Sequence, residues 1–200
     1  MRVPEARPAF RLPAASSLRR LALRVRDLEA AVSFYADRLG MPVSGRDGGR
    51  VALAPAGGAF AIDLVHAPQA PVRPHPSIGL YHFALLLPDR ASLAAVIRRL
   101  TEARWRVDGA SDHGVSEACY LRDPEGNGIE LYRDRPRETW PTGPAGIEMM
   151  TAPLDVAGLL AEAEEAGPLS WKRDEWGQVT YQQDNLGSRS PAAASRRYWP

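Results

Sequence analysis

Hydrophobic and polar positions first alternate and then take up helical spacing near the start of the chain. Leu21, Leu23 and Val25 occur at every second position and are flanked by Arg20, Arg24 and Arg26, which predicts a half-buried strand. Asp27 is a plausible N-cap for the helix that follows, and Gly40 is a natural end for it. The apolar positions with helical spacing between them are Leu28, Ala31, Val32, Tyr35 and Leu39. Further strands are expected at 51–53 and 60–65, on either side of a Gly57-Gly58 turn.

The same order of patterns returns later in the chain. An apolar strand is predicted over 81–87, and Asp89 can cap a helix that carries Leu93, Val96, Ile97 and Leu100. Shorter strands are expected at 105–107 and 118–121. Residues 123–128 form a predicted turn, in which Asn127-Gly128 is a strong hairpin signal, and residues 128–132 form the return strand.

These two segments overlay as an internal repeat of a βαβββ unit. Leu21, Leu23 and Asp27 fall on Phe83, Leu85 and Asp89, so Arg20 falls on His82. In the closing strands, Asp63 falls on Glu130. The predicted fold class is therefore α+β, with paired βαβββ modules that form a cupped mixed sheet and an irregular C-terminal tail.

Both ends of the chain differ from the repeats. Residues 1–17 contain Pro4, Pro8 and Pro13 and are interpreted as a flexible extension. After Arg133, a linker precedes a helix predicted over 154–166, and residues 168–200 show no clear period. We divide the chain into the extension 1–17, a domain of two repeats at 18–140, and a segment 141–200 of linker, short helix and poorly ordered tail.

Composition narrows the classes of function. The 200 residues include 25 Lys and Arg against 24 Asp and Glu, so the basic excess typical of a nucleic-acid or anionic-membrane binder is missing. Cys119 is the only cysteine, which excludes an intramolecular disulfide and favours a cytoplasmic location. Residues 1–20 contain no continuous apolar region, and no apolar stretch approaches the roughly 18–20 residues of a membrane span, so neither a signal peptide nor membrane insertion is expected.

The polar residues inside the predicted strands carry the candidate chemistry. His82 interrupts an apolar strand, either as a core histidine bonded to the backbone or as a ligand. Glu130 faces away from Ile129 and Leu131, and together with His82 it could hold a divalent cation. His113, in the polar stretch 111–114, is a solvated loop residue or an acid/base group, and Tyr120 either packs or donates a hydrogen bond to a bound oxygen. Cys119 is interpreted as a small core residue.

These patterns resemble the vicinal-oxygen-chelate superfamily, which includes glyoxalase I, bleomycin-resistance proteins and extradiol dioxygenases. Leu23-Arg-Val-Arg-Asp-Leu28 with Phe34-Tyr35 resembles the start of the first module, and residues 79–89 resemble the start of the second. The most specific stretch runs from Ser111 through Asp123-Pro-Glu-Gly-Asn-Gly128 to Arg137, which is similar to bacterial proteins of the catechol-2,3-dioxygenase type. Such relatives usually continue with a second pair of modules, so residues 141–200 are interpreted as a remnant of one.

The resemblance implies a metal site. His82 and Glu130 match two of the three ligands of the extradiol relatives, with Fe(II) or Mn(II) as the metal, and His113 and Tyr120 match the acid/base and hydrogen-bonding positions. Arg20 occupies the position of the remaining ligand, and a guanidinium offers a metal no lone pair. Asp63 is a weak candidate in its place, beside water or a group from a second subunit.

We therefore expect a metal-dependent ring-cleaving dioxygenase of the extradiol type, acting on a catechol-like aromatic diol and dioxygen. The alternatives are a non-catalytic binder that sequesters a small molecule and a glyoxalase-like isomerase or lyase on the same fold. No nucleic acid or membrane is expected as a partner, and a homodimer is one assembly that the sequence allows.

Overall fold

The first repeat forms a four-stranded sheet with one helical segment. A computed structural model describes residues 11, 13, 16–55, 60–74, 78–165 and 179–182. The elements of the first repeat are β1 (Arg20–Val25), α1 (Leu28–Val32), the π-helical turn η1 (Ser33–Arg38), β2 (Val43–Asp47), β3 (Arg50–Leu53) and β4 (Ala61–His66). The strand order in this sheet is β1-β4-β3-β2, and β1 and β4 run parallel.

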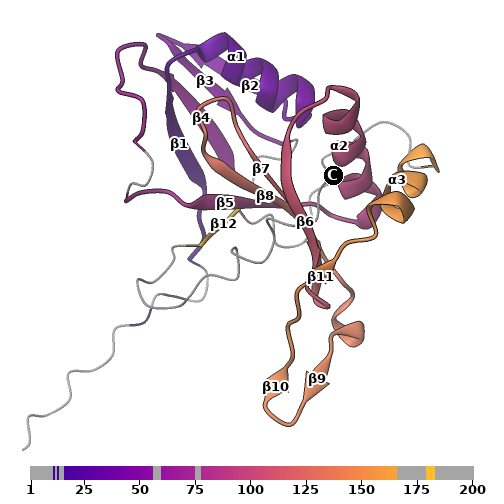
Figure 1. The fold of residues 1–200 in the computed structure, drawn as a ribbon. Coiled ribbons are helices and arrows are strands. Elements are labelled where there is room, and N and C mark those ends of the chain that lie inside the picture. Colours follow the sequence, from indigo (N-terminus) through magenta and orange to yellow (C-terminus); the bar gives the residue numbers. More distant parts are fainter. Residues whose placement is uncertain are drawn as a thin grey trace, which may run out of the picture.

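The second repeat has the same order of elements. It comprises β5 (His82–Leu86), α2 (Arg90–Glu102), β6 (Val107–Asp112), β7 (Ser116–Arg122) and β8 (Gly128–Asp134). Its strands are ordered β6-β7-β8-β5 within a six-stranded sheet, and β5 and β8 again run parallel. The predicted α+β fold with two βαβββ repeats is thus confirmed (Figure 1).

Local signals explain where the helices begin. The side chain of Asp27 accepts a hydrogen bond from the Ala30 amide at 2.9 Å, and that of Asp89 accepts one from the Ser92 amide at 2.7 Å. Both N-caps were predicted, since an aspartate in this position satisfies an amide that the helix leaves without a partner. The helices cover one face of each sheet, and the apolar residues between them, Cys119 included, form one core.

The second repeat departs from the predictions in two places. Strand β6 begins at Val107 rather than at Trp105 and ends at Asp112, so Ser111 and Asp112 lie in a strand. The turn to β7 consists of residues 113–115. The turn before β8 is also not centred on Asn127-Gly128. Instead, the positive φ of 85° lies at Gly126, whose amide donates to the Asp123 carbonyl at 3.0 Å.

Gly128 is required by strand packing rather than by a turn. A Cβ atom at this position would lie 2.5 Å from the Tyr81 carbonyl oxygen and 2.9 Å from Cβ of His82. The absence of a side chain therefore lets β8 approach β5 at the start of their parallel ladder.

The turn at 123–128 also joins the two repeats. The buried hydroxyl of Tyr35, in η1, donates to Oδ2 of Asp123 at 2.9 Å. Burial raises the pKa of Asp123, although hydrogen bonds from Asn127 and Tyr35 favour the carboxylate. In the same turn, Glu125 accepts from Nε of Arg26 at 2.8 Å. The turn 123–128, which belongs to the stretch that resembles the family, therefore also holds the two repeats together.

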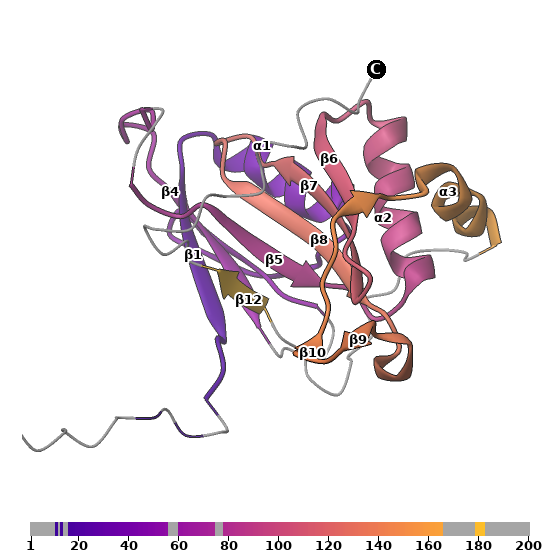
Figure 2. The same ribbon diagram turned by 60° about the horizontal axis from the view of Figure 1, so that its bottom comes forward.

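Residues beyond 134 add to the second repeat. They form the 3₁₀ turn η2 (Arg137–Thr139), the two-stranded hairpin β9 (Thr142–Gly143) and β10 (Gly146–Ile147), then β11 (Ala152–Pro153), α3 (Val156–Glu165) and β12 (Val179–Gln182). The helix predicted at 154–166 is confirmed as α3, which packs beside α2 (Figure 2). Strands β11 and β12 pair with β6 and β5. The rest of the predicted tail, 168–178 and 183–200, lies outside the described residues.

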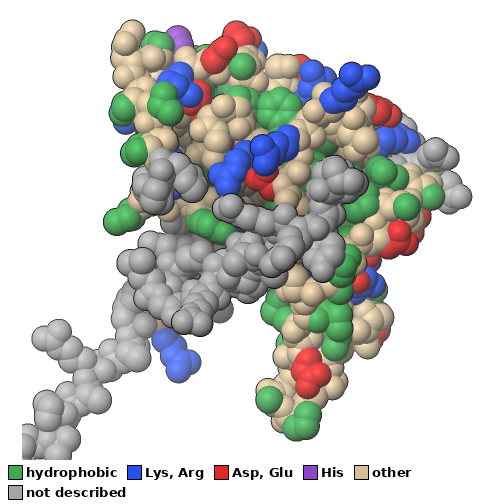
Figure 3. Space-filling view, viewed as in Figure 1, with side chains coloured by type: hydrophobic (Ala, Val, Ile, Leu, Met, Phe, Trp, Pro, Cys, Tyr) green, Lys and Arg blue, Asp and Glu red, His purple; other side chains and the backbone are tan. Residues whose placement is uncertain are grey.

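The β9–β10 hairpin projects from the body as an arm (Figure 1). The space-filling view shows apolar side chains on the surface of this arm (Figure 3). Ile147, Met149 and Met150 are exposed along the arm or at its base. Among the described helices, none has the length and apolar character needed to cross a lipid bilayer.

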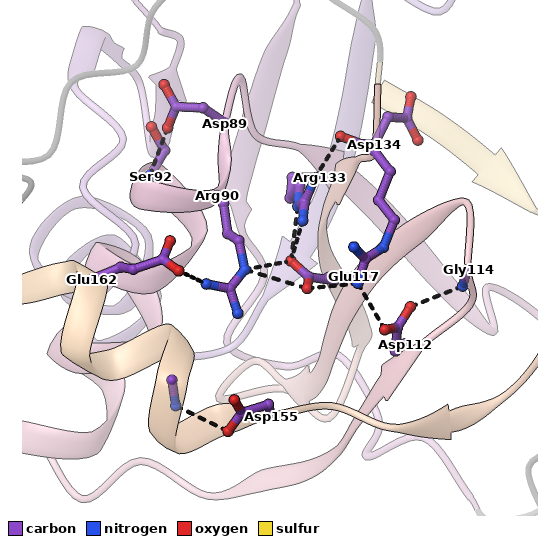
Figure 4. Close-up of polar contacts among 12 residues, drawn as sticks. Asp89, Arg90, Ser92, Asp112, Gly114, Glu117, Arg133, Asp134, Asp155 and Glu162 are labelled. Carbon is purple, nitrogen blue, oxygen red and sulfur yellow. Dashed lines mark hydrogen bonds and ion pairs between the residues drawn. The ribbon is translucent and has the colours of Figure 1, made fainter. Parts of the chain in front are cut away.

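A network of charges fastens the helices to the second sheet. Glu117, in β7, is 3% exposed and contacts Arg90 of α2, Arg133 of β8 and Arg135 at 2.6–2.9 Å (Figure 4). Arg90 also pairs with Glu162 of α3, so the network reaches from the sheet to both helices. A buried carboxylate is tolerated here because three guanidiniums compensate it.

Tyr35→Phe tests the junction between the repeats. Removing the hydroxyl leaves Asp123 with one hydrogen bond fewer in a buried place, which should lower the free energy of unfolding by about 1–3 kcal/mol. For a chain of this size that corresponds to a fall in Tm of roughly 2–4 °C per kcal/mol in thermal denaturation. Tyr81→Phe, at a half-exposed ring, is the matched control. Equal stability of the two variants would show that the Asp123 turn does not depend on Tyr35.

Candidate functional site

Two parallel strands bring His82 and Glu130 together. Strand β5 pairs with β8 so that His82 lies opposite Gly128 and Ala84 opposite Glu130. His82 and Glu130 therefore project from the sheet face opposite the core residues Phe83 and Leu131. Nε2 of His82 lies 3.2 Å from Oε2 of Glu130, and each side chain is 14% exposed.

The contact between these two side chains is close but poorly aligned. Although 3.2 Å separates the atoms, the buried Nε2 of His82 has no hydrogen-bond partner in the described part of the chain. A buried polar nitrogen without a hydrogen-bond partner costs folding free energy unless another group or an ion contacts it. An imidazole nitrogen next to a carboxylate is also the donor set that divalent iron or manganese accepts. The donor chemistry of the pair thus fits a divalent metal ion.

Tyr120 and His113 extend this pair into a chain of four side chains. Tyr120, on β7, lies directly opposite Glu130 in the ladder, and its hydroxyl is 3.0 Å from Oε1. On its other side the hydroxyl is 2.9 Å from Nε2 of His113. The structure therefore brings together all four residues singled out in the sequence, in the order His82, Glu130, Tyr120 and His113.

The segment after the second repeat fixes the His113 ring. Nδ1 of His113 is 2.9 Å from the Met150 carbonyl oxygen, and the Met150 amide donates to the His113 carbonyl at 3.1 Å. Because a carbonyl only accepts, Nδ1 must carry a proton. The contact of Met150 with His113 could not be predicted from the sequence, because every residue type has the same backbone carbonyl.

Two arrangements of hydrogens can satisfy both contacts between His113, Tyr120 and Glu130. Tyr120 has a single hydroxyl hydrogen and cannot donate to both neighbours. In one arrangement Tyr120 donates to an ionised Glu130 and His113 donates from Nε2 as an imidazolium. In the other, a protonated Glu130 donates to Tyr120, and Tyr120 donates to a neutral His113. Both arrangements satisfy every contact, and they differ only by a proton moved along the chain.

Tyr120 itself stays protonated. Burial raises its pKa far above the usual value of 10.0, and the charge of Glu130 and the hydrogen bond to Glu130 raise it further. A phenol in this environment is a donor that relays a proton without losing its own.

Arg20, which replaces the expected third ligand, is tied to Asp63. Its NH1 group lies 2.6 and 2.7 Å from the two oxygens of Asp63, and Arg50 contacts Oδ2 at 2.5 Å. Burial disfavours the Asp63 carboxylate, but the hydrogen bonds and charges of both arginines outweigh it and hold its pKa below the usual 3.8.

Asp63 is therefore neither a solvated strand residue nor a third donor for His82 and Glu130. Its side chain is 2% exposed, and both oxygens are engaged by guanidinium groups. No cluster of three or more His, Cys, Asp or Glu side chains suited to a metal occurs among the described residues. The candidate site thus offers two protein donors.

His66 and Cys119 do not take part in this chain of side chains. His66 ends β4 and is exposed, while His75 falls outside the described residues. Cys119 is 1% exposed in the core, and burial raises the pKa of its thiol to about 12. A thiol in that state is a core residue and not a nucleophile.

Comparison with known sequences places these features in a family. Residues 17–131 match the model of the Glyoxalase/Bleomycin resistance protein/Dioxygenase superfamily. The chain is 42% identical over 154 residues to a Bacillus subtilis catechol-2,3-dioxygenase, covering 76% of this chain and 54% of that protein. It therefore spans about half the length of this relative. It is also 33% identical over 126 residues to an uncharacterized protein of Pseudomonas aeruginosa, covering 60% of this chain and 90% of the relative.

Solved structures show the same fold. A glyoxalase/dioxygenase from Nostoc punctiforme superimposes with a TM-score of 0.56 at 18% identity, covering 66% of this chain and all (100%) of that one. A glyoxalase/bleomycin resistance protein/dioxygenase from Alicyclobacillus acidocaldarius gives a TM-score of 0.50 at 19% identity, covering 62% of this chain and 95% of that one. With the duplicated βαβββ topology and the family match over more than half of its length, the chain belongs to the Glyoxalase/Bleomycin resistance protein/Dioxygenase superfamily.

Proposed function

We propose that this protein is a metal-dependent dioxygenase of the extradiol type, which opens the ring of a catechol-like aromatic diol. The observation that carries the proposal is the buried, unpartnered Nε2 of His82 at 3.2 Å from the Glu130 carboxylate. The 42% identity to a catechol-2,3-dioxygenase supports the same class of reaction. Fe(II) or Mn(II) is the proposed metal.

His82 and Glu130 would hold the metal ion. A bound Fe(II) or Mn(II) ion supplies Lewis acidity toward diol oxygens and electron transfer toward dioxygen. His82 must be neutral and Glu130 ionised to act as ligands. Of the two arrangements described above, only the one in which Tyr120 donates to an ionised Glu130 is compatible with metal binding.

His113 and Tyr120 supply the proton chemistry. Tyr120 orders the site by donating to Glu130, and His113 is poised to give or take a proton at Nε2. The Met150 carbonyl keeps Nδ1 protonated, so Nε2 is the position that changes state. With Glu130 ionised as a ligand, His113 is the group of this chain of side chains that can exchange a proton with the substrate.

A specific observation favours a second candidate, a non-catalytic binder of small molecules. Arg20 takes the place of the third ligand, and Asp63 binds the Arg20 and Arg50 guanidiniums instead of a metal. A site with two protein donors can bind a polar ligand through these side chains even where it holds metal weakly. A glyoxalase-like isomerase or lyase on the same fold is the other alternative, because the fold does not determine the chemistry.

Metal content and oxygen uptake separate these functions. Protein purified with added Fe(II) should hold iron stoichiometrically and consume oxygen with catechol. His82→Ala and Glu130→Gln should each lose the metal and the oxygen uptake, whereas His66→Ala, at an exposed histidine, should lose neither. Bound metal without oxygen uptake would favour an isomerase or lyase. Small-molecule binding with no metal would favour the binder.

Gly114→Ala tests the placement of His113. Gly114 has a φ of 75°, and an added Cβ would lie 3.1 Å from Cγ of Pro141 and 3.3 Å from Cγ of Met150. The substitution should push the Met150 backbone away from His113 and shift the ¹⁵N resonance of His113 Nδ1 in the NMR spectrum. It should also lower oxygen uptake with catechol by roughly tenfold, which corresponds to about 1.4 kcal/mol.

Gly126→Ala is the matched control for this variant. Gly126 has a similar φ of 85°, but nothing lies within 4 Å of an added Cβ. Both substitutions strain a left-handed backbone, which should cost each variant roughly 1–2 kcal/mol of stability. Gly114→Ala adds the close contacts with Pro141 and Met150, so its total cost should be larger. A His113 resonance that moves equally in both variants would mean that Met150 does not position the ring.

A further inference from the structure

The first repeat places an ion pair where the second repeat places its candidate metal ligands. In the parallel ladder of β1 and β4, Arg20 lies opposite Ala61 and Ala22 opposite Asp63. In the ladder of β5 and β8, His82 lies opposite Gly128 and Ala84 opposite Glu130. Arg20 and Asp63 thus hold the positions of His82 and Glu130, on the sheet face that the helices leave uncovered.

Asp63 holds two guanidiniums in place on this face. It is 2% exposed and bonds to both, whereas the side chains of Arg20 and Arg50 are 54% and 48% exposed. We call this group the arginine clamp: Arg20 and Arg50 on Asp63. A buried anion under two half-exposed cations fixes the cations and leaves part of each guanidinium open to a ligand.

The clamp carries an excess of positive charge. Two arginines share a single carboxylate, and Arg24, on the same face of β1, is exposed and has no ion pair with any residue that the structure describes. The neighbours of Asp63 across the ladders, Ala22 and Ala52, are small and add no charge to this face. Asp47 lies opposite Arg50 in the ladder of β2 and β3 and shares this face, so three cations stand against two carboxylates. The remaining positive charge repels a metal ion and attracts an anionic ligand.

The chemistry of the clamp selects the type of anion. A guanidinium presents its N–H groups as a planar fork, which matches a carboxylate in two parallel hydrogen bonds. Strands β1 and β5, which carry Arg20 and His82, lie close together in both ribbon views (Figures 1 and 2). A ligand that spans the two repeats can therefore present a carboxylate to one and its other polar groups to the other.

We propose that Arg20, Arg50 and Arg24 bind the carboxylate of the substrate, so that the ligand of this protein is an aromatic diol that also carries an acid group. The diol part of this inference rests on the function proposed above. The anion site itself rests only on the clamp.

Binding measurements with three probes test the proposal: 3,4-dihydroxybenzoate, catechol and benzoate. Titration calorimetry under nitrogen, at constant ionic strength and with Fe(II) present, should show dihydroxybenzoate bound at least tenfold more tightly than catechol. Arg24→Gln and Arg50→Gln should each reduce this ratio severalfold and leave the affinity for catechol unchanged. Arg24→Gln breaks no ion pair, so it tests the site even where Arg50→Gln weakens the fold.

Arg46→Gln is the matched control, because it removes the same charge elsewhere. Arg46 pairs with Glu29 of helix α1, on the helix-covered side of the sheet, and both side chains are exposed. This variant should keep the full preference for dihydroxybenzoate. Equal affinity of the wild type for dihydroxybenzoate and catechol would overturn the proposal, as would a preference that survives in both Arg24→Gln and Arg50→Gln.

Benzoate separates this inference from the proposed function. Its binding without metal, lost in Arg24→Gln and kept in Arg46→Gln, supports the anion site even where neither diol leads to oxygen uptake. Conversely, oxygen uptake with catechol and no measurable benzoate binding would retain the dioxygenase and reject the anion site.

Discussion

Parallel pairing between the first and last strands of each repeat determines which side chains can meet. Within one repeat, β5 and β8 are separated by a helix and two strands, yet their ladder sets Ala84 opposite Glu130 and brings His82 within 3.2 Å of the carboxylate. A slip of one residue would turn Glu130 into the core and Leu131 out of it. The buried apolar residues on the other face of both strands, including Phe83, Leu85 and Ile129, prevent that slip. The core thus fixes the geometry of the site.

Much of the fold follows from local signals in the sequence. Strand alternation, two aspartate N-caps and the similarity of residues 20–27 to 82–89 were enough to predict both repeats, because each signal acts over a few residues. The grouping of His82, Glu130, Tyr120 and His113 also agrees with the positions expected from the resemblance. The pairing of Arg50 with Asp63 was not predicted, since it depends on the register of β3 against β4, which no local pattern specifies. The hydrogen bond of the Met150 carbonyl to His113 could not be predicted for a different reason, because every residue has a backbone carbonyl.

The stretch from Ser111 to Arg137, which carries the family resemblance, serves two purposes on two faces of one hairpin. Tyr120 and Glu130 are cross-strand partners on the face of the candidate site. Glu117 and Arg133 are also partners in this ladder, but they point to the other side, where they fasten α2 and α3. Because strand side chains alternate, neighbouring residues in such a motif can be chemical or structural. A motif match alone does not distinguish them.

The two repeats differ most in the charge that their equivalent positions can accept. His82 and Glu130 form a pair whose imidazole nitrogen lacks a partner, so a cation would complete it. Arg20 and Asp63 form an ion pair with no net charge. Arg50 and Arg24 then give that sheet face a net positive charge. A cation held by one repeat and an anion held by the other would attract each other. The equivalent positions of the two repeats are therefore complementary in charge rather than identical. A ligand bound between them is held at both ends, and its orientation is fixed before any reaction begins.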